Sequence, residues 1–239
     1  MTAPTWQAFY NAGWQFPFAV MVVPFAFLLY RAIARERSEY ALDPALAPFV
    51  SLWVTLFTLE TLLDPIATGP IASWLGGVFT AAGLHPNLAG NLLGTTFVAL
   101  GDFRVFWLVL CFRTPEQTPR RAALEAAALT TLAPTLAGLV SLTGVPAQAM
   151  WLTHELLSLA LAFALARFAL PNAATHPQHA QFVRRVLGYM AAYYGLWAAA
   201  DVIILAGFDA GWPVRLVPNQ LYYGFFVPFV WRAFFSNRG

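Results

Sequence analysis

Seven apolar stretches of this chain are each about as long as the 20 residues that a helix needs to cross a bilayer. A water-soluble domain of 239 residues has too little interior for a chain that is 59% hydrophobic and 10% charged. The sequence therefore predicts an all-α, multi-pass membrane protein of the cell inner membrane or an endomembrane, and it excludes soluble enzymes and nucleic-acid binders. We expect one domain over residues 1–239, a bundle of seven transmembrane helices. The stretches run from Gln15 to Ala34, Ala47 to Ala67, Gly90 to Arg113, Arg121 to Leu142, Pro146 to Leu170, Phe182 to Phe208 and Trp212 to Phe235.

The arginines predict how the bundle is oriented. All 13 basic residues are arginine, and eleven of them lie beside alternate ends of the seven stretches. Basic residues favour cytoplasmic loops, so we expect an outside amino terminus and a cytoplasmic carboxyl terminus. The loops on the outer side carry only Arg215. The eleven are Arg31, Arg35, Arg37, Arg113, Arg120, Arg121, Arg167, Arg184, Arg185, Arg232 and Arg238.

The segment between the second and third stretches does not fit a simple bundle. Residues Pro65 to Ala89 are mostly apolar but contain seven prolines and glycines, which is too interrupted for a spanning helix. We expect Ile71 to Leu84 to form a capping segment on the outer face. An ordinary connecting loop is the alternative interpretation.

Polar side chains recur inside the predicted spans, where each charge costs about 2.5 to 3.5 kcal/mol. At about 1.5 Å of rise per residue, most of them fall in the outer half of the bilayer, so we expect one cavity beneath the capping segment. The free-energy cost of burying five carboxylates and one guanidinium must be lowered. Protonation of the acids, a bound cation or water can lower it. The charged residues are Glu60, Asp64, Asp102, Arg104, Glu155 and Asp201, with His154, Asn219 and Gln220 beside them.

Acidic and aromatic residues share helix faces. Trp53, Phe57, Glu60 and Asp64 follow one another at helical spacing, as do Tyr194, Trp197 and Asp201. Trp151 with Glu155 repeats this pattern, and Asn219 with Tyr223 gives an amide version of it. Chance and interfacial aromatic belts are the alternative explanation for any single stripe.

A buried neutral acid above aromatic rings suits carbocation chemistry, because the acid can donate a proton and the ring faces stabilise the cation. We expect a hydrophobic isoprenoid substrate from the bilayer, membrane lipid as the surroundings, and no cofactor, no metal ion and no nucleic acid. The absence of lysine excludes Schiff-base chemistry. The candidate catalytic residues are Glu60, Asp64, His154, Glu155 and Asp201. The candidate substrate-binding residues are Trp53, Phe57, Asp102, Arg104, Trp151, Tyr194, Trp197, Asn219, Tyr222 and Tyr223.

The chain resembles the small integral-membrane terpene cyclases of fungal meroterpenoid and indole-diterpene pathways. The resemblance rests on length, seven helices and the acid that ends the segment Leu56 to Glu60; weaker similarities lie in 99–104, 147–151 and 200–202. It implies cyclisation started by protonation, with Glu60 as the first candidate donor. The family has a second acid on its last helix, where this chain has Asn219, so Asp201 or Asp64 would take that role.

Other functions stay open at this point. A proton- or cation-coupled transporter of a small hydrophobic molecule also needs intramembrane acids, and Glu60 with Asp64 could share Mg²⁺ in a metal-dependent enzyme. A receptor or structural subunit is a third class. We expect Arg104 to neutralise an acid on a neighbouring helix, and we do not interpret His154 with Ser158 as a catalytic dyad.

Overall fold

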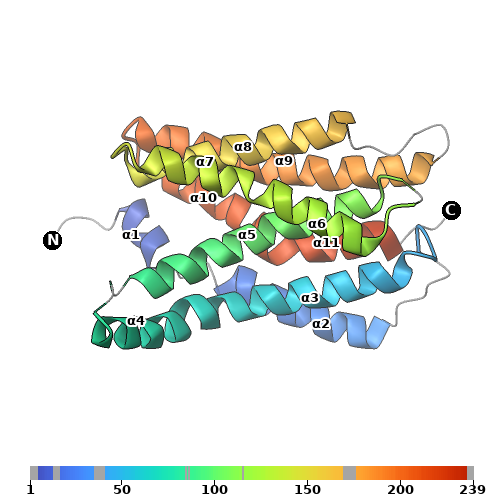
Figure 1. The fold of residues 1–239 in the computed structure, drawn as a ribbon, viewed down its shortest axis with the longest axis horizontal. Coiled ribbons are helices and arrows are strands. Elements are labelled where there is room, and N and C mark those ends of the chain that lie inside the picture. Colours follow the sequence, from blue (N-terminus) through green and yellow to red (C-terminus); the bar gives the residue numbers. More distant parts are fainter. Residues whose placement is uncertain are drawn as a thin grey trace.

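The computed structural model describes residues 5–12, 17–34, 41–83, 85, 87–114, 116–168 and 176–235. All secondary structure in these ranges is helical, which confirms the predicted all-α class. The long helices lie lengthwise side by side (Figure 1). The elements are α1 (Trp6–Asn11), η1 (Phe18–Val22), α2 (Val23–Ala34), α3 (Ala47–Ile66), η3 (Ala67–Ile71), α4 (Ala72–Ala81), α5 (Leu88–Cys111), α6 (Pro119–Thr130), α7 (Leu132–Ser141), α8 (Ala147–Phe168), α9 (Pro177–Leu205), α10 (Gly211–Asn219), η4 (Gln220–Phe225) and α11 (Phe226–Phe235), where η marks a π-helical turn.

Within the described ranges, five helices are long and apolar enough to cross a membrane. They are Ala47–Ala81, Leu88–Cys111, Pro119–Ser141, Ala147–Phe168 and Pro177–Leu205. A shorter apolar helix, Phe18–Ile33, occupies the first predicted stretch. In the last predicted stretch, α10, η4 and α11 follow one another without a break.

The expectation that the second span ends at Ala67, with a separate capping segment after it, is wrong. The helix continues from Ala47 to Ala81. Proline lacks an N–H and its ring collides with the carbonyl one turn earlier, so a regular α-helix would break here. The π-helical turn Ala67–Ile71, which contains Pro70, widens the helix locally and lets it continue. Of the predicted segment, Leu84 and Pro86 lie outside the described residues.

Apolar side chains cover the outside of the bundle as well as its interior. On α3, Leu52, Leu56, Leu59 and Leu63 are between 44% and 56% exposed. They form a stripe at helical spacing, while Trp53 on the same helix is fully buried. An exposed apolar stripe of this length is stable against lipid and unfavourable in water. Together with the five long helices, it is the architecture of a multi-pass membrane protein.

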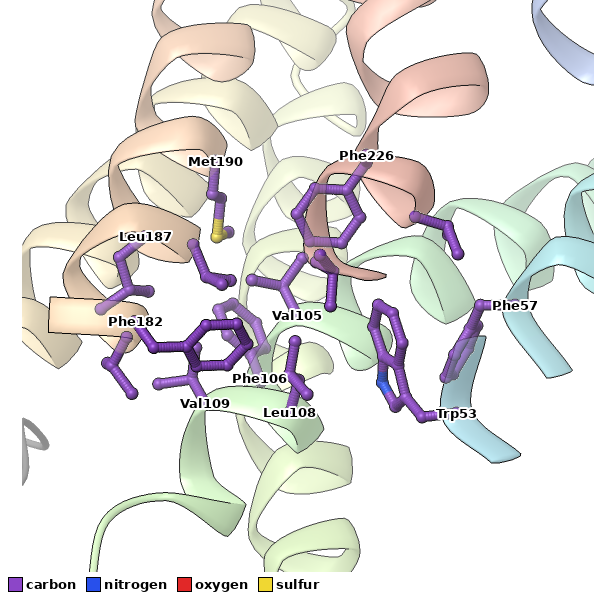
Figure 2. Close-up of a cluster of buried hydrophobic side chains, with 14 of the residues drawn as sticks. Trp53, Phe57, Val105, Phe106, Leu108, Val109, Phe182, Leu187, Met190 and Phe226 are labelled. Atoms are coloured by element: carbon purple, nitrogen blue, oxygen red, sulfur yellow. The ribbon is translucent and has the colours of Figure 1, made fainter. Parts of the chain in front are cut away.

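Buried apolar side chains from several helices form one core cluster. Figure 2 shows side chains of α3, α5, α9 and α11 meeting there. Those of α5 and α9 come from the second half of α5 and the first half of α9, which lie toward the end of the bundle where α11 ends (Figure 1). The labelled core residues include Trp53, Val105, Phe106, Leu108, Val109, Phe182, Leu187, Met190 and Phe226.

Five of the described arginines lie at that same end of the bundle. Arg31, Arg167 and Arg232 lie in the last turns of α2, α8 and α11. Arg113 follows α5, and the first turn of α6 carries Arg121. Of the predicted set, Arg35, Arg37 and Arg238 lie outside the described residues. The polar interior described next occupies the opposite half, toward α1 and α4.

Candidate functional site

A cavity of about 330 Å³ opens between α8, α9, α10 and η4 in the half of the bundle away from the arginine-rich end. Its volume lies at the lower end of the roughly 300–1,000 Å³ typical of small-molecule sites. Helix α1 contributes to its wall, as does α5. The lining residues are Tyr10, Asn11, Val98, Gln148, Trp151, His154, Glu155, Tyr194, Trp197, Trp212, Arg215, Asn219, Tyr222 and Tyr223.

The turn between α9 and α10 sets the shape of this cavity. Gly207 has φ of +88°, a left-handed conformation that suits glycine and ends α9. The Phe208 amide donates to the Ile203 carbonyl at 3.1 Å, and the Gly207 amide donates to the Ile204 carbonyl at 2.9 Å. These two bonds form a Schellman motif. Because Asp201 lies just before this turn and Arg215 just after it, the turn brings the two side chains together.

Gly211 lets α10 lie directly on α9. A Cβ at this position would come within 2.6 Å of the Ala200 carbonyl oxygen and of the Ile204 side chain. Any larger residue would separate the two helices. The close approach places Arg215, one turn further along α10, beside Asp201.

Helix α1 is fixed over the cavity by the same turn. The carboxylate of Asp209 accepts hydrogen bonds from the backbone amides of Trp6 at 2.7 Å and Gln7 at 3.1 Å. This bonding satisfies amides at the start of α1 that have no partner within the helix. It positions Tyr10, whose hydroxyl accepts from Arg215 Nε at 3.4 Å and from Asn219 Nδ2 at 3.2 Å. Trp197 Nε1 donates to Asn219 Oδ1 at 2.9 Å and completes this polar rim.

Arg215, Asp201 and Glu155 form a buried charged cluster. Arg215 Nη1 donates to Asp201 Oδ1, and Arg215 Nη2 lies 3.6 Å from Glu155 Oε1. The side chains of Asp201 and Glu155 are 0% and 3% exposed. Asp201 is enclosed, whereas Glu155 lines the cavity. One cation facing two carboxyl groups is electrically neutral only when one carboxyl carries a proton.

A second polar group surrounds Asp102 on α5. The Tyr194 hydroxyl donates to Asp102 Oδ1, and His154 Nε2 lies 3.3 Å from Asp102 Oδ2. Asp102 is 1% exposed and does not line the cavity, but His154 and Tyr194 do. The carboxylate therefore holds both rings in place from behind the cavity wall.

Glu60 and Arg104 form a third group. Arg104 Nη1 lies 3.7 Å from Glu60 Oε2, as the sequence predicted for an acid on a neighbouring helix. Arg104 Nη2 donates to the Tyr222 carbonyl at 2.6 Å, and the guanidinium lies 4.5 Å from the centre of the Tyr222 ring. Trp53 Nε1 donates to the Arg104 carbonyl at 3.0 Å. Only Tyr222 of this group reaches the cavity.

Asp64 lies at a second cavity, of about 770 Å³, between α3, η3, α5 and α8. This cavity shares Val98, Trp151 and Tyr223 with the first, so these three side chains separate the two spaces.

The predicted polar residues thus form three groups around one half of the bundle. Those that line the first cavity are His154, Glu155, Trp151, Tyr194, Trp197, Asn219, Tyr222 and Tyr223. Asp201 and Asp102 lie directly behind it through their contacts with Arg215 and His154. Glu60, Trp53 and Phe57 do not line the first cavity, and Trp53 and Phe57 belong to the apolar core.

Two residues of the site were missed from the sequence. Arg215 was expected in an outer loop, but it lies on α10 with its side chain 12% exposed, bound to both acids. Its spacing of four residues from Asn219 was the available signal, because it puts both on one helix face. Tyr10 had no such signal, since its contacts come from residues more than 200 positions away.

The described residues contain no group of three or more histidine, cysteine, aspartate or glutamate side chains placed to hold a metal ion. Comparison with protein-family models, with curated proteins and with solved structures found no match to this chain. The functional argument therefore depends on the geometry of the site.

Proposed function

We propose that this protein is an integral-membrane isoprenoid cyclase that starts carbocation cyclisation by protonation from Glu155. The observation that supports this most is the position of Glu155, which faces an aromatic-walled cavity while sharing a single cation with Asp201. The arrangement favours one ionised and one protonated acid. Asp201 bonds directly to Arg215 and is the better carboxylate, which leaves Glu155 as the acid.

The initiating step transfers the carboxyl proton of Glu155 to a terminal alkene or epoxide of the substrate. With an alkene, a C–H bond forms and the adjacent carbon becomes cationic; with an epoxide, the oxygen takes the proton and a C–O bond opens. Glu155 becomes a carboxylate 3.6 Å from the Arg215 guanidinium, which stabilises the new negative charge. The same guanidinium therefore makes the donor a stronger acid as the proton leaves.

The cavity walls would stabilise the cation as it moves along the folding chain. Seven tyrosine and tryptophan side chains line this space, and a ring face contributes about 2 kcal/mol or more to a desolvated cation. Removal of water from the reacting chain prevents early capture of the cation. The seven are Tyr10, Trp151, Tyr194, Trp197, Trp212, Tyr222 and Tyr223.

His154 is suited to end the reaction. Its ring lines the cavity, and its Nε2 lies 3.3 Å from Asp102 Oδ2, which would stabilise an imidazolium. Loss of a proton from the final cation to His154 forms an alkene. Return of this proton to Glu155 restores the starting state, so the overall reaction is an isomerisation that needs no oxidant or reductant.

We further propose that the chain crosses the membrane seven times, with its amino terminus outside and its carboxyl terminus in the cytoplasm. Two crossings come from the run η1–α2 and from the run α10–η4–α11, beside the five long helices. Arginines at one end of the bundle support the direction. The cavity would then lie in the outer half of the bilayer, where a lipid-soluble substrate is available.

The test is turnover by the full chain in liposomes, with polyprenyl alcohols, prenylated phenols and their terminal epoxides as substrates. We expect cyclic products isomeric with the substrate, and a loss of about 10²–10⁴-fold in Glu155→Gln. Glu60→Gln is the matched comparison, because it removes an acid that is paired with Arg104 away from the cavity. Full turnover by Glu155→Gln would refute this donor. Substrate-dependent proton flux without any product would indicate a transporter instead.

A further inference from the structure

The second cavity is large enough to hold a small ligand. Its lining includes three glycines, which are Gly69 on η3 and Gly90 and Gly94 on α5. Glycines between membrane helices usually allow the backbones to approach closely. At these three positions a Cβ would meet nothing within 4 Å, so the space that the glycines leave is open.

This open space adjoins the proposed reaction cavity. Val98, Trp151 and Tyr223 line both spaces, and Trp151, which is 36% exposed, comes from the same helix as Glu155. A ligand that passes these side chains would occupy both spaces. The second is the larger, at about 770 Å³ against about 330 Å³.

The second cavity also offers polar groups to one end of a ligand. The carboxylate of Asp64 lines it, as do Thr68, Asn91 and Thr95. The Thr68 hydroxyl donates to the Asp64 backbone carbonyl at 2.8 Å and lies 3.3 Å from Asp64 Oδ1. The oxygens of a carboxyl group accept hydrogen bonds, so Asp64 can hold a ligand end group that donates one.

We infer that the second cavity binds the non-reacting end of an elongated isoprenoid, with a hydroxyl on Asp64 and the chain running past Trp151 toward Glu155. This inference rests on the proposed function for the identity of the reacting end, although binding in the second cavity needs no turnover. The ligand class is an isoprenoid chain with a hydrogen-bond donor at one terminus. The space along η3 and α5 determines how long that chain can be.

The test measures the binding of geraniol, farnesol and geranylgeraniol to the full chain in detergent. The change in tryptophan fluorescence reports the binding. Wild type should bind geranylgeraniol about tenfold or more tightly than geraniol, because the longer chain fills both spaces. Gly94→Leu places a side chain in the open space. It should weaken geranylgeraniol binding about tenfold and change geraniol binding by less than about threefold. Gly138→Leu on α7 is the matched control, since a Cβ there also meets nothing within 4 Å.

The hydroxyl contact is tested separately with geranylgeraniol and its methyl ether. Wild type should prefer the alcohol by up to about tenfold, the value of one hydrogen bond, and Asp64→Leu should lose this preference. The inference is overturned if Gly94→Leu leaves geranylgeraniol binding unchanged, if it weakens both alcohols equally, or if wild type does not distinguish alcohol from ether. Should Gly94→Leu not fold, Gly90→Leu on the same face replaces it.

These results separate the two proposals. Glu155→Gln should bind all three alcohols as wild type does. Length-dependent binding without cyclisation would refute the cyclase and leave the second cavity as a ligand site. Cyclisation that is insensitive to Gly94→Leu would refute the second cavity and leave the cyclase.

Discussion

Arg215 on α10 binds Asp201 on α9 across the short turn that joins the two helices, and both side chains are almost completely removed from solvent. The same guanidinium lies 3.6 Å from Glu155 on α8. The guanidinium of Arg215 therefore links α8, α9 and α10 at the wall of the cavity. The predictions that follow depend on this cluster and on the packing around it.

Removal of the cation should destabilise the fold. Arg215→Met leaves two buried carboxyl groups without a counter-charge, for which we expect a loss of about 3–5 kcal/mol in the free energy of unfolding. Chemical unfolding in detergent, followed by circular dichroism, measures it. Arg185→Met is the control, because Arg185 is exposed on α9. Equal stability of the two variants would contradict a structural role for Arg215.

Gly101 should tolerate no side chain. A Cβ there would collide with the Tyr222 hydroxyl, and the backbone of Tyr222 holds Arg104. Overpacking of this kind costs about 1–3 kcal/mol, so Gly101→Ala should lower the unfolding temperature. Gly94→Ala on the same helix meets open space and should be neutral or stabilising by up to about 1 kcal/mol. If both variants unfold alike, α5 does not lie against Tyr222 as described.

His154→Asn should change the products more than the stability. Without the imidazole the final cation loses its proton acceptor, so water should capture it and alcohols should replace alkenes. Gas chromatography with mass spectrometry of the extracted products distinguishes the two. His179→Asn is the control, because His179 pairs with Asp43 at 3.2 Å near the start of α9, distant from the cavity. An unchanged product ratio in His154→Asn would assign termination to another base.

A charge on the outer face of α3 should impair membrane insertion. Leu59 is 44% exposed on the apolar stripe, and an arginine at such a position costs about 2.5–3.5 kcal/mol on insertion scales. Leu59→Arg should therefore reduce the membrane-inserted fraction in a glycosylation-mapping assay. Leu59→Phe keeps the face apolar and should insert as wild type does. Normal insertion of both would place this face away from lipid.

Much of the bundle could be predicted from local sequence. Apolar length gives the long helices, and position along each helix gives the depth of a polar residue. On this information the sequence predicts Glu60, Asp64, His154, Glu155, Asp201 and Asn219 at one level, and of these His154, Glu155 and Asn219 line the first cavity. It also led to Arg104 as the neutralising partner of an acid, which the structure identifies as Glu60.

The remainder depends on helix rotation and on contacts between distant segments. Depth does not say which face of a helix turns inward, so the placement of Glu60 with Arg104 apart from the cavity was not predictable. The sequence places Arg215 in a loop, because a basic residue near a helix end resembles a topology signal. It also predicts a break at Pro70, because a π-helical turn has no strong sequence signature.

The contact between α1 and the turn before α10 has a consequence for biogenesis. Trp6 and its partner Asp209 are 203 positions apart, so a ribosome must synthesise most of the protein before they can meet. Tyr10 cannot cover the cavity until the final hairpin has left the translocon. Nascent or prematurely terminated chains would carry acids exposed to lipid, and such chains would be recognisable to membrane quality control before any of them could react with a substrate.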